Sequence, residues 1–301
     1  MKNHHTDRQA LTQAITGACI ISFSPIIAKL SSLPSTTEAF YRMLFGGIAL
    51  CIIAILLRAK FWQGWRPILY AIACAFFFAG DLYFWQLSIE NVGPGLATIL
   101  GNLQVFILTI VGVLAYRETI TIRTIVAFPL ALLGLIMLVG ADWHTLSPAY
   151  RIGLYEGFIA ALFYSGFVIT LRKAQKDQDH LPPSSNLVMI CGMAVVMLGI
   201  LAFFQNESLI IHITSNWLWM ILYGVLCQAF AWLLISKGLP NIPISYTGYI
   251  LLLQPALAFI WDIVIFKRPT PPIEIAGAII TIFAIYLSTS GRKKMRSRVN
   301  A

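Results

Sequence analysis

Apolar stretches of about twenty residues follow one another along the chain, and short polar connections separate them. A helix needs about 20 apolar residues to cross a hydrocarbon core about 30 Å thick. The pattern therefore predicts an all-α membrane protein with ten transmembrane helices. We expect these spans at 12–32, 38–57, 67–88, 93–115, 122–140, 152–171, 185–204, 216–236, 244–265 and 271–290.

The composition agrees with a chain that lies mostly in lipid. Charged residues make up only 11% of the chain and hydrophobic residues 58%, whereas a soluble protein carries about 25% charged residues. All five cysteines fall inside expected spans, so they are interpreted as packing residues and not as a disulfide framework. The five histidines lie at the N-terminus or in connections, with no metal-ligand spacing, and no motif indicates a cofactor.

The net charge of +9 is unevenly distributed among the connections. If the N-terminus is inside, sixteen of the 21 basic residues lie in cytoplasmic segments, and only Arg151, Lys267 and Arg268 lie outside. This positive-inside bias predicts that both termini are cytoplasmic. The basic excess is therefore an orientation signal in the lipid bilayer, we expect no nucleic-acid partner, and we expect a multi-pass protein of the cell membrane, the bacterial inner membrane.

A weak internal repeat becomes visible when the sequence is compared with itself. With a shift of 150 residues, "NVGPGLATILGNLQVFILTIVGVLAYRETIT" aligns without a gap with "NIPISYTGYILLLQPALAFIWDIVIFKRPTP". Upstream, the shift becomes 147. The matched polar and aromatic pairs are Asn91 with Asn241, Gln104 with Gln254, Asp81 with Gln228, and Trp85 with Trp232.

This repeat has a topological consequence. Each half contains five expected helices, and because five is odd, the halves must cross the membrane in opposite senses. We therefore expect two inverted five-helix repeats, residues 1–150 and 151–301, the second ending in a basic cytoplasmic tail. Inverted repeats are typical of secondary transporters, in which the binding site lies near the midplane at the repeat interface.

Several of these features resemble the EamA-type transporters of the drug/metabolite transporter superfamily. They are the two five-helix halves, the segment "FYRMLFGG" from Phe40 to Gly47, and the block "GLATILGNLQVFILTIVGVLAYRETITIRTIVAFPLALLGLIML". The resemblance covers nearly the whole chain. It implies a ten-helix carrier of small metabolites with a central cavity lined by helices 1, 3, 4, 6, 8 and 9, but it names no substrate. The second half departs from the family pattern, because Lys267-Arg268 replaces the acidic turn.

Asp81 is the leading candidate for a substrate-binding residue. It follows the run "FFFAG" deep in the third expected span, where a charge costs about 2.5–3.5 kcal/mol even on lenient insertion scales. Trp85 lies one turn further on the same helix face. A carboxylate beside an aromatic ring can bind an ammonium group through charge attraction and a cation–π interaction together. The alternative is a structural aspartate paired with a neighbouring helix.

Other polar and aromatic residues near mid-depth are further candidates. Amides at such depth often join helices, but the repeat relates Gln104 to Gln254, as expected for a shared cavity. Glu156, one turn inside its span, either extends to the interface or lies at the cavity rim. The remaining candidates for the substrate-binding site are Asn102, Tyr164, Gln228, Trp232 and Tyr249.

Two basic residues inside spans are interpreted as structural charge partners. Lys29 and Arg42 lie near the expected outer ends of their helices, where long side chains reach the interface, and Arg42 is a plausible partner for Asp81. Asp262 lies near an outer helix end, where solvation at the interface is expected. Pro25, Pro129 and Pro255 indicate helix bends.

These observations favour a secondary transporter, an exporter or exchanger that works by alternating access as a monomer or homodimer. The expected substrate is a small molecule such as an amino acid or a similar zwitterionic or amphiphilic compound, because the mid-depth groups are mostly amides and aromatics. A proton on Asp81 could couple transport to a pH gradient. The alternatives are a passive facilitator and, more distantly, an intramembrane enzyme, for which Asp81 and Asp262 are the only candidate aspartate pair but lie at different depths.

Overall fold

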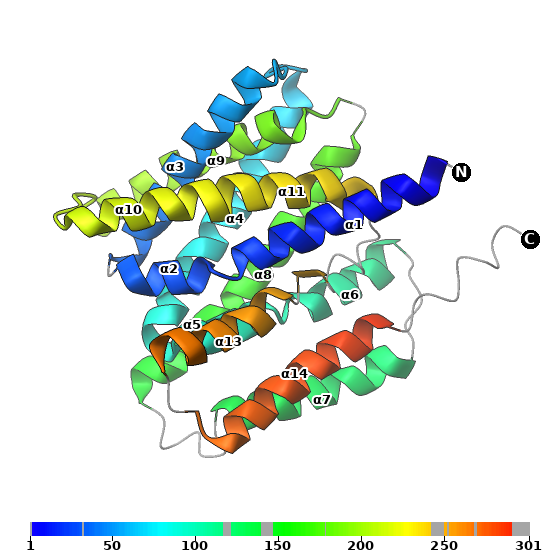
Figure 1. Ribbon diagram of the computed structural model, residues 1–301, viewed down its shortest axis with the longest axis vertical. Helices are drawn as coiled ribbons and strands as arrows, with labels where there is room; N and C mark the ends of the chain where they lie inside the picture. Colours follow the sequence, from blue (N-terminus) through cyan, green and yellow to red (C-terminus); the bar gives the residue numbers. More distant parts are fainter. Residues whose placement is uncertain are drawn as a thin grey trace, which may run out of the picture.

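The computed structural model describes residues 2–31, 33–116, 122–139, 147–177, 179–241, 250–251, 253–267 and 270–290. These parts of the chain form helices joined by turns, without a strand among them, so the all-α fold class is confirmed (Figure 1). The helices of the first half are α1 (Lys2–Ile21), α2 (Ser24–Ser31), α3 (Ser35–Leu56), α4 (Trp65–Val92), α5 (Pro94–Gly101), α6 (Gln104–Tyr116) and α7 (Ile122–Val139).

The second half continues with α8 (Pro148–Lys176), α9 (Pro183–Phe204), α10 (Thr214–Leu222), the π-helix η2 (Tyr223–Phe230), α11 (Ala231–Gly238), the 3₁₀-helix η3 (Leu239–Asn241), α13 (Leu253–Phe266) and α14 (Pro272–Ser290). Within the described residues, six helical segments are long and apolar enough to cross a membrane. They are Gln9–Ser31, Ser35–Leu56, Trp65–Val92, Pro148–Lys176, Pro183–Phe204 and Thr214–Gly238. Shorter apolar helices lie at Leu96–Gly112, Leu253–Phe266 and Pro272–Ala284.

The first expected span, 12–32, is interrupted where α1 meets α2. Pro25 has no N–H for the carbonyl of Ile21, four residues earlier. The Ser22 hydroxyl donates to the Cys19 carbonyl at 2.6 Å, and the Phe23 N–H donates to the Ile20 carbonyl at 3.3 Å. The expected proline bend is therefore a break between two helices.

The fourth expected span, 93–115, is also interrupted, between α5 and α6. The Asn102 side chain donates to the Thr98 carbonyl at 2.8 Å and so competes with the backbone for that acceptor. The next turns use shorter-range bonds, with the Leu103 N–H donating to the Leu100 carbonyl and the Val105 N–H to the Asn102 carbonyl. This local switch tightens the backbone and separates the two helices.

The helices pack in pairs around a central core. α4 packs against α8, α1 against α11, and α3 against α9, while α7 and α14 lie side by side at one end of the molecule (Figure 1). Phe78 stacks on Phe167 with ring centroids 4.1 Å apart, and Trp232 meets Phe78 edge-on at 5.2 Å. This aromatic cluster joins α4, α8 and α11 in the middle of the bundle.

Two glycines allow α3 and η2 to cross closely. A Cβ atom on Gly224 would lie 2.6 Å from the backbone nitrogen of Gly46 and 2.6 Å from Cβ of Phe45. Because a backbone atom cannot rotate away, even a methyl group at this position forces the two elements apart.

We therefore predict that Gly224→Ala destabilises the protein, by about 1–3 kcal/mol, as is typical of overpacking. Thermal unfolding of the purified protein in detergent measures the effect. Gly192→Ala is the matched control, because a Cβ at Gly192 has no neighbour within 4 Å. Equal unfolding temperatures for the two variants would show that the crossing is not tightly packed.

Candidate functional site

A cavity of about 50 Å³ lies in the middle of the bundle, between the two helix interruptions. This space holds a few water molecules, since one water needs about 10–15 Å³ measured in this way. The lining residues come from α1, α2, α3, α4, α5, α8, α11, α13 and the two interruptions. They are Ile21, Ser22, Ser24, Pro25, Arg42, Phe78, Asp81, Leu82, Trp85, Thr98, Gly101, Asn102, Tyr164, Trp232 and Gln254.

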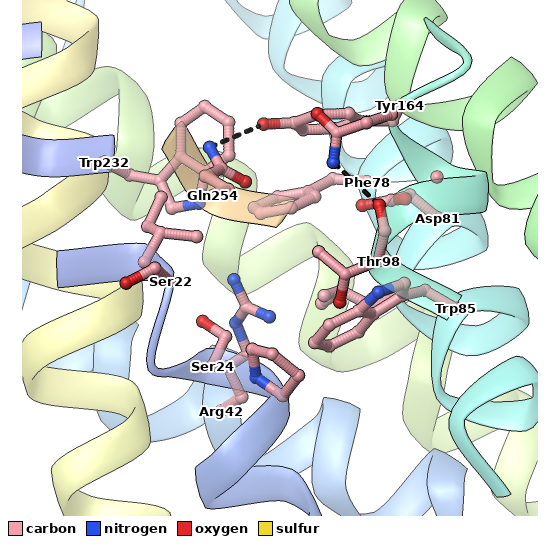
Figure 2. A pocket seen from close by; sticks show the side chains of 15 residues that line it. Ser22, Ser24, Arg42, Phe78, Asp81, Trp85, Thr98, Tyr164, Trp232 and Gln254 are labelled. Atoms are coloured by element: carbon pink, nitrogen blue, oxygen red, sulfur yellow. Dashed lines mark hydrogen bonds between the residues drawn. The ribbon is translucent and has the colours of Figure 1, made fainter. Parts of the chain in front are cut away.

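Arg42 extends from α3 into this cavity (Figure 2). Its Nε donates to Oε1 of Gln228 at 3.1 Å, and its Nη1 donates to the Tyr223 hydroxyl at 2.9 Å. The guanidinium carbon lies 4.7 Å from the centroid of the Tyr223 ring. Its other terminal nitrogen, Nη2, makes no hydrogen bond to the described part of the chain.

The π-helix explains how one element supplies both of these acceptors. Tyr223 and Gln228 are five residues apart in η2, and a π-helix closes its hydrogen bonds between residues i and i+5. Two side chains at this spacing therefore lie on the same face of η2. Single-turn π segments often occur at functional sites, and this one holds Arg42 in place with neutral groups.

Asp81 lies on another wall of the cavity, on α4, with Trp85 on the same side (Figure 2). Its side chain is partly exposed, and among the described residues nothing makes a hydrogen bond or an ion pair with its carboxylate. The plausible pairing of Asp81 with Arg42 is not among the ion pairs of the described residues. The hydrogen bonds of the guanidinium go to Tyr223 and Gln228 on η2 instead.

The remaining walls are aromatic or carry amides. Tyr164 lies near Trp232, with centroids 6.0 Å apart, and the Gln254 amide donates to the Tyr164 hydroxyl at 3.4 Å. The Trp232 Nε1 is buried and has no hydrogen-bond partner in the described part of the chain. Asn102 uses its amide to bond Thr98 at the α5–α6 interruption.

The structure brings together six of the ten residues expected to bind substrate. Asp81, Trp85, Asn102, Tyr164, Trp232 and Gln254 line the cavity. Gln104 and Gln228 are buried behind it, where Gln228 supports Arg42 and the Gln104 amide points to Asn102 at 3.5 Å. Tyr249 lies outside the described residues.

Glu156 lies away from the cavity lining. One of its carboxylate oxygens accepts a hydrogen bond from the Asn91 amide at 2.9 Å, and its side chain is half-buried. The contact joins α8 to the end of α4. Of its two expected positions, the cavity lining does not include Glu156, and the position at the membrane interface stays a prediction.

Lys29 and Asp262 form an ion pair of 3.6 Å between α2 and α13. Lys29 also lies 4.1 Å above the Phe266 ring. The expectation that Asp262 is solvated at the interface is wrong, because its side chain is only 1% exposed. Lys29 is therefore a structural charge partner, as expected, but its partner is Asp262.

Four further residues line the cavity although the sequence did not indicate this: Arg42, Ser22, Ser24 and Thr98. Arg42 was expected near an outer helix end, from where its long side chain would reach the interface. Pro25 was the available signal for the serines, since a proline within an apolar span marks a break whose flanking residues can face a cavity.

We predict that Gln228→Leu lowers stability by about 1–3 kcal/mol or more, because it leaves a buried charged N–H donor of Arg42 without its acceptor. Gln228→Glu restores an acceptor and serves as the comparison. Thermal unfolding in detergent distinguishes the two. If Gln228→Leu unfolds at the wild-type temperature, the amide does not hold Arg42.

Comparisons with known proteins agree with this architecture. The model of the EamA-like transporter family matches residues 9–140 and again residues 151–290. The chain is 24% identical over 296 residues to YxxF, an uncharacterized transporter of Bacillus subtilis (strain 168), with 97% of this chain and 93% of the relative covered.

A solved structure described only as "Crystal structure of protein" has the same fold. The two share 15% sequence identity and a TM-score of 0.71, with 93% of this chain and 98% of the other covered. Together with the apolar helices, the family matches indicate a multi-pass membrane protein. Because the family model covers most of the chain in two matches, this protein belongs to the EamA-like transporter family.

Proposed function

We propose that this transporter is a secondary carrier of small zwitterions, above all amino acids with apolar side chains, and that it works by alternating access as an exporter or exchanger. One observation carries the proposal. Arg42 and Asp81 face one cavity, and within the described residues they form no ion pair with each other or with a third group.

Two opposite charges that face one apolar cavity favour a ligand that carries both charges itself. Isolated charges in a low dielectric are strongly unfavourable unless they are paired. A zwitterion can place its carboxylate on Nη2 of Arg42 and its ammonium on Asp81. Trp85 lies beside Asp81 and can add a cation–π contact with the ammonium group.

The aromatic walls suit an apolar side chain on the substrate. Phe78, Tyr164 and Trp232 form one surface of the cavity, and the buried Trp232 Nε1 offers a donor. The backbone at the two interruptions adds polar groups, as in other carriers with discontinuous helices. These walls therefore suit a substrate that carries few charges and a large apolar surface.

An amino acid is larger than the few waters that the cavity can hold, so the helices must separate for a substrate to enter. The interruptions at Ser22–Phe23 and at Asn102–Leu103 are natural places for such a movement, because few helical hydrogen bonds cross them. Both adjoin the cavity, so a change in either hinge changes the site directly. This geometry supports alternating access.

The helix contacts support the proposed inverted repeat of residues 1–150 and 151–301. Suppose that each of the five spans of one half is replaced by the corresponding span of the other half. Each of the following helix contacts then becomes a contact that is also observed. α4–α8 maps onto α11–α1, α3–η2 onto α9–α4, and α5–α8 onto α13–α1, while α3–α9, α5–α13 and α7–α14 map onto themselves. A two-fold axis between the halves gives this pattern, and the family model also matches each half separately.

Ten spans with both termini in the cytoplasm of the bacterial inner membrane complete the proposed arrangement. The beginning of α1 and the end of α14 lie on the same side of the molecule (Figure 1). The basic residues of the connections gather in the segments assigned to the cytoplasm.

We predict that a reporter fused after Ala301 is active only if it is a cytoplasmic enzyme. A periplasmic reporter at the same place and reporters in the α8–α9 connection serve as controls. Activity of the periplasmic reporter after Ala301 would contradict both the orientation and the inverted repeat.

Transport through this site is either driven by a proton gradient or passive. If Asp81 takes up a proton when it releases the ammonium group, transport exchanges protons for substrate. If Asp81 stays ionised throughout, the protein is a passive facilitator. A hydrolytic site built from Asp81 and Asp262 is not supported, because Asp262 pairs with Lys29 and does not line the cavity.

We predict that L-leucine stabilises the purified protein against heat, whereas 3-methylbutylamine and 4-methylpentanoate, which each lack one charged group, bind at least about tenfold more weakly. Thermal-shift titration measures all three. Equal shifts for the three compounds would mean that Arg42 and Asp81 do not bind opposite ends of one ligand.

In proteoliposomes, Asp81→Asn should lose most L-leucine counterflow while its folding stays intact, because the ammonium partner is gone. Glu156→Gln is the matched control, since it removes a half-buried carboxylate that lies outside the cavity lining. Wild-type counterflow in Asp81→Asn would exclude the proposed role.

A further inference from the structure

Glu38 is a buried carboxylate outside the cavity lining. It is on α3 one turn before Arg42, so both side chains lie on the same helix face. Its side chain is only 4% exposed. One carboxylate oxygen, Oε2, accepts a hydrogen bond from the Gln86 amide at 3.1 Å, whereas Oε1 is buried without a hydrogen-bond partner in the described part of the chain.

Gln86 has the same deficiency. Its amide nitrogen donates to Glu38, but its Oε1 is also buried, and no described group donates to it. A buried acceptor without a donor is unfavourable, because it has lost its hydrogen bonds to water and gained none in the protein. Glu38 and Gln86, which a hydrogen bond already joins, therefore each contain one such acceptor.

One proton resolves both deficiencies. A protonated carboxyl group has an O–H donor and keeps an acceptor oxygen. With the proton on Oε1, Glu38 can donate to Oε1 of Gln86 while it accepts from Nε2 of the same amide. The result is a cyclic acid–amide pair in which each polar atom has a partner.

We propose that Glu38 is a proton-binding site, and that its proton moves across the membrane together with the substrate. The proton comes from water on one side, binds to Oε1 of Glu38 and returns to water on the other side, so no further reactant is needed. This proposal rests on the proposed zwitterion carrier and its cavity, and it replaces export or exchange with symport of proton and substrate.

The residues around Glu38 bear on how protons reach it and on which charges act on it. Glu90 lies at the exposed end of α4, and the Ser35 hydroxyl donates to it, which gives protons a polar route from the rim. α10 carries no titratable residue. The elements packed around Glu38 carry the following titratable or charged groups: Tyr41, Arg42 and Cys51 on α3; Arg66, Tyr70, Cys74, Asp81, Tyr83 and Glu90 on α4; Cys191 on α9; Glu207 in the turn that follows α9; and Tyr223 and Cys227 on η2.

Arg42 links the proton to the substrate. When Glu38 is ionised, its negative charge competes with a substrate carboxylate for the field of Arg42. When Glu38 is protonated, it is neutral, and the positive charge of Arg42 attracts only the substrate carboxylate. Proton and substrate therefore bind together and travel in the same direction, which is opposite to the exchange expected if Asp81 carries the proton.

The first test needs no substrate. If folded Glu38 holds a proton at a pH where an unfolded glutamate is ionised, the native state binds more protons, and stability falls as pH rises. Glu38→Gln keeps the shape of the protonated form and removes this dependence. We expect the unfolding temperature of wild type minus that of Glu38→Gln to decrease steadily from mildly acidic to mildly alkaline pH. Asp179→Asn is the matched control, because it removes an exposed carboxylate in the connection between α8 and α9, and it should show no such trend.

The second test uses L-leucine in proteoliposomes with the membrane potential clamped at zero. A gradient of one pH unit is worth about 1.4 kcal/mol per proton, and hence about tenfold accumulation for a single coupled proton. Wild type should accumulate L-leucine about tenfold in the alkaline compartment. Glu38→Gln should keep counterflow but lose accumulation, and Asp179→Asn should behave as wild type.

The outcomes separate this proposal from the proposed function. Failure of L-leucine to bind contradicts the zwitterion carrier, while the substrate-free pH test still decides whether Glu38 holds a proton. Accumulation in the acidic compartment, no accumulation, or a pH-independent stability difference each overturns the Glu38 proposal. If Glu38→Gln does not fold, calorimetry of L-leucine binding to wild type in buffers of different ionisation enthalpy must show about one proton taken up, and zero uptake overturns the proposal.

Discussion

The burial of one guanidinium group organises the centre of this transporter. Arg42 is 3% exposed, and its hydrogen bonds to the described residues go to two neutral groups, the Gln228 amide and the Tyr223 hydroxyl. Neutral acceptors satisfy the directions of the N–H donors without cancelling the charge. The positive field therefore extends into the cavity, toward Asp81 on one side, and acts on Glu38 one turn away on the other.

The irregular backbone around this group follows from the same need. Lipid offers no hydrogen-bond partners, so departures from a regular helix are tolerated only where they are buried in protein or line a cavity. The two helix breaks border the cavity, and η2 holds Arg42 next to it. Regular helices such as α9 and α14 lie further out, where a large part of their apolar surface is exposed.

The charged residues inside the spans differ in their environment, and this difference separates structure from function. Lys29 and Asp262 pair directly and join α2 to α13, so their charges are already neutralised. Asp81 shares a cavity with Arg42, but within the described residues the two form no ion pair. Glu38 is hydrogen-bonded to the Gln86 amide, and each of the two side chains has a buried oxygen atom to which no described group donates. A paired charge stabilises helix packing, whereas the unpaired charges are the ones that we propose bind a ligand and a proton.

The helical fold could be predicted from the amino-acid sequence, because the length and apolarity of each stretch are local properties that the bilayer thickness constrains. Asp81, Trp85 and Gln254 could be predicted as site candidates in the same way, since polar groups deep in apolar stretches are unfavourable without a reason. The partner of each charge becomes visible only in the folded protein, because that partner comes from a helix far along the chain. Gln228 and Arg42 form a hydrogen bond although they are 186 residues apart in the chain. The sequence around Arg42 gives no sign of the π-helix on which Gln228 lies. For the same reason, the cavity position of Arg42 and the unfilled acceptors of Glu38 and Gln86 are properties of the packed molecule alone.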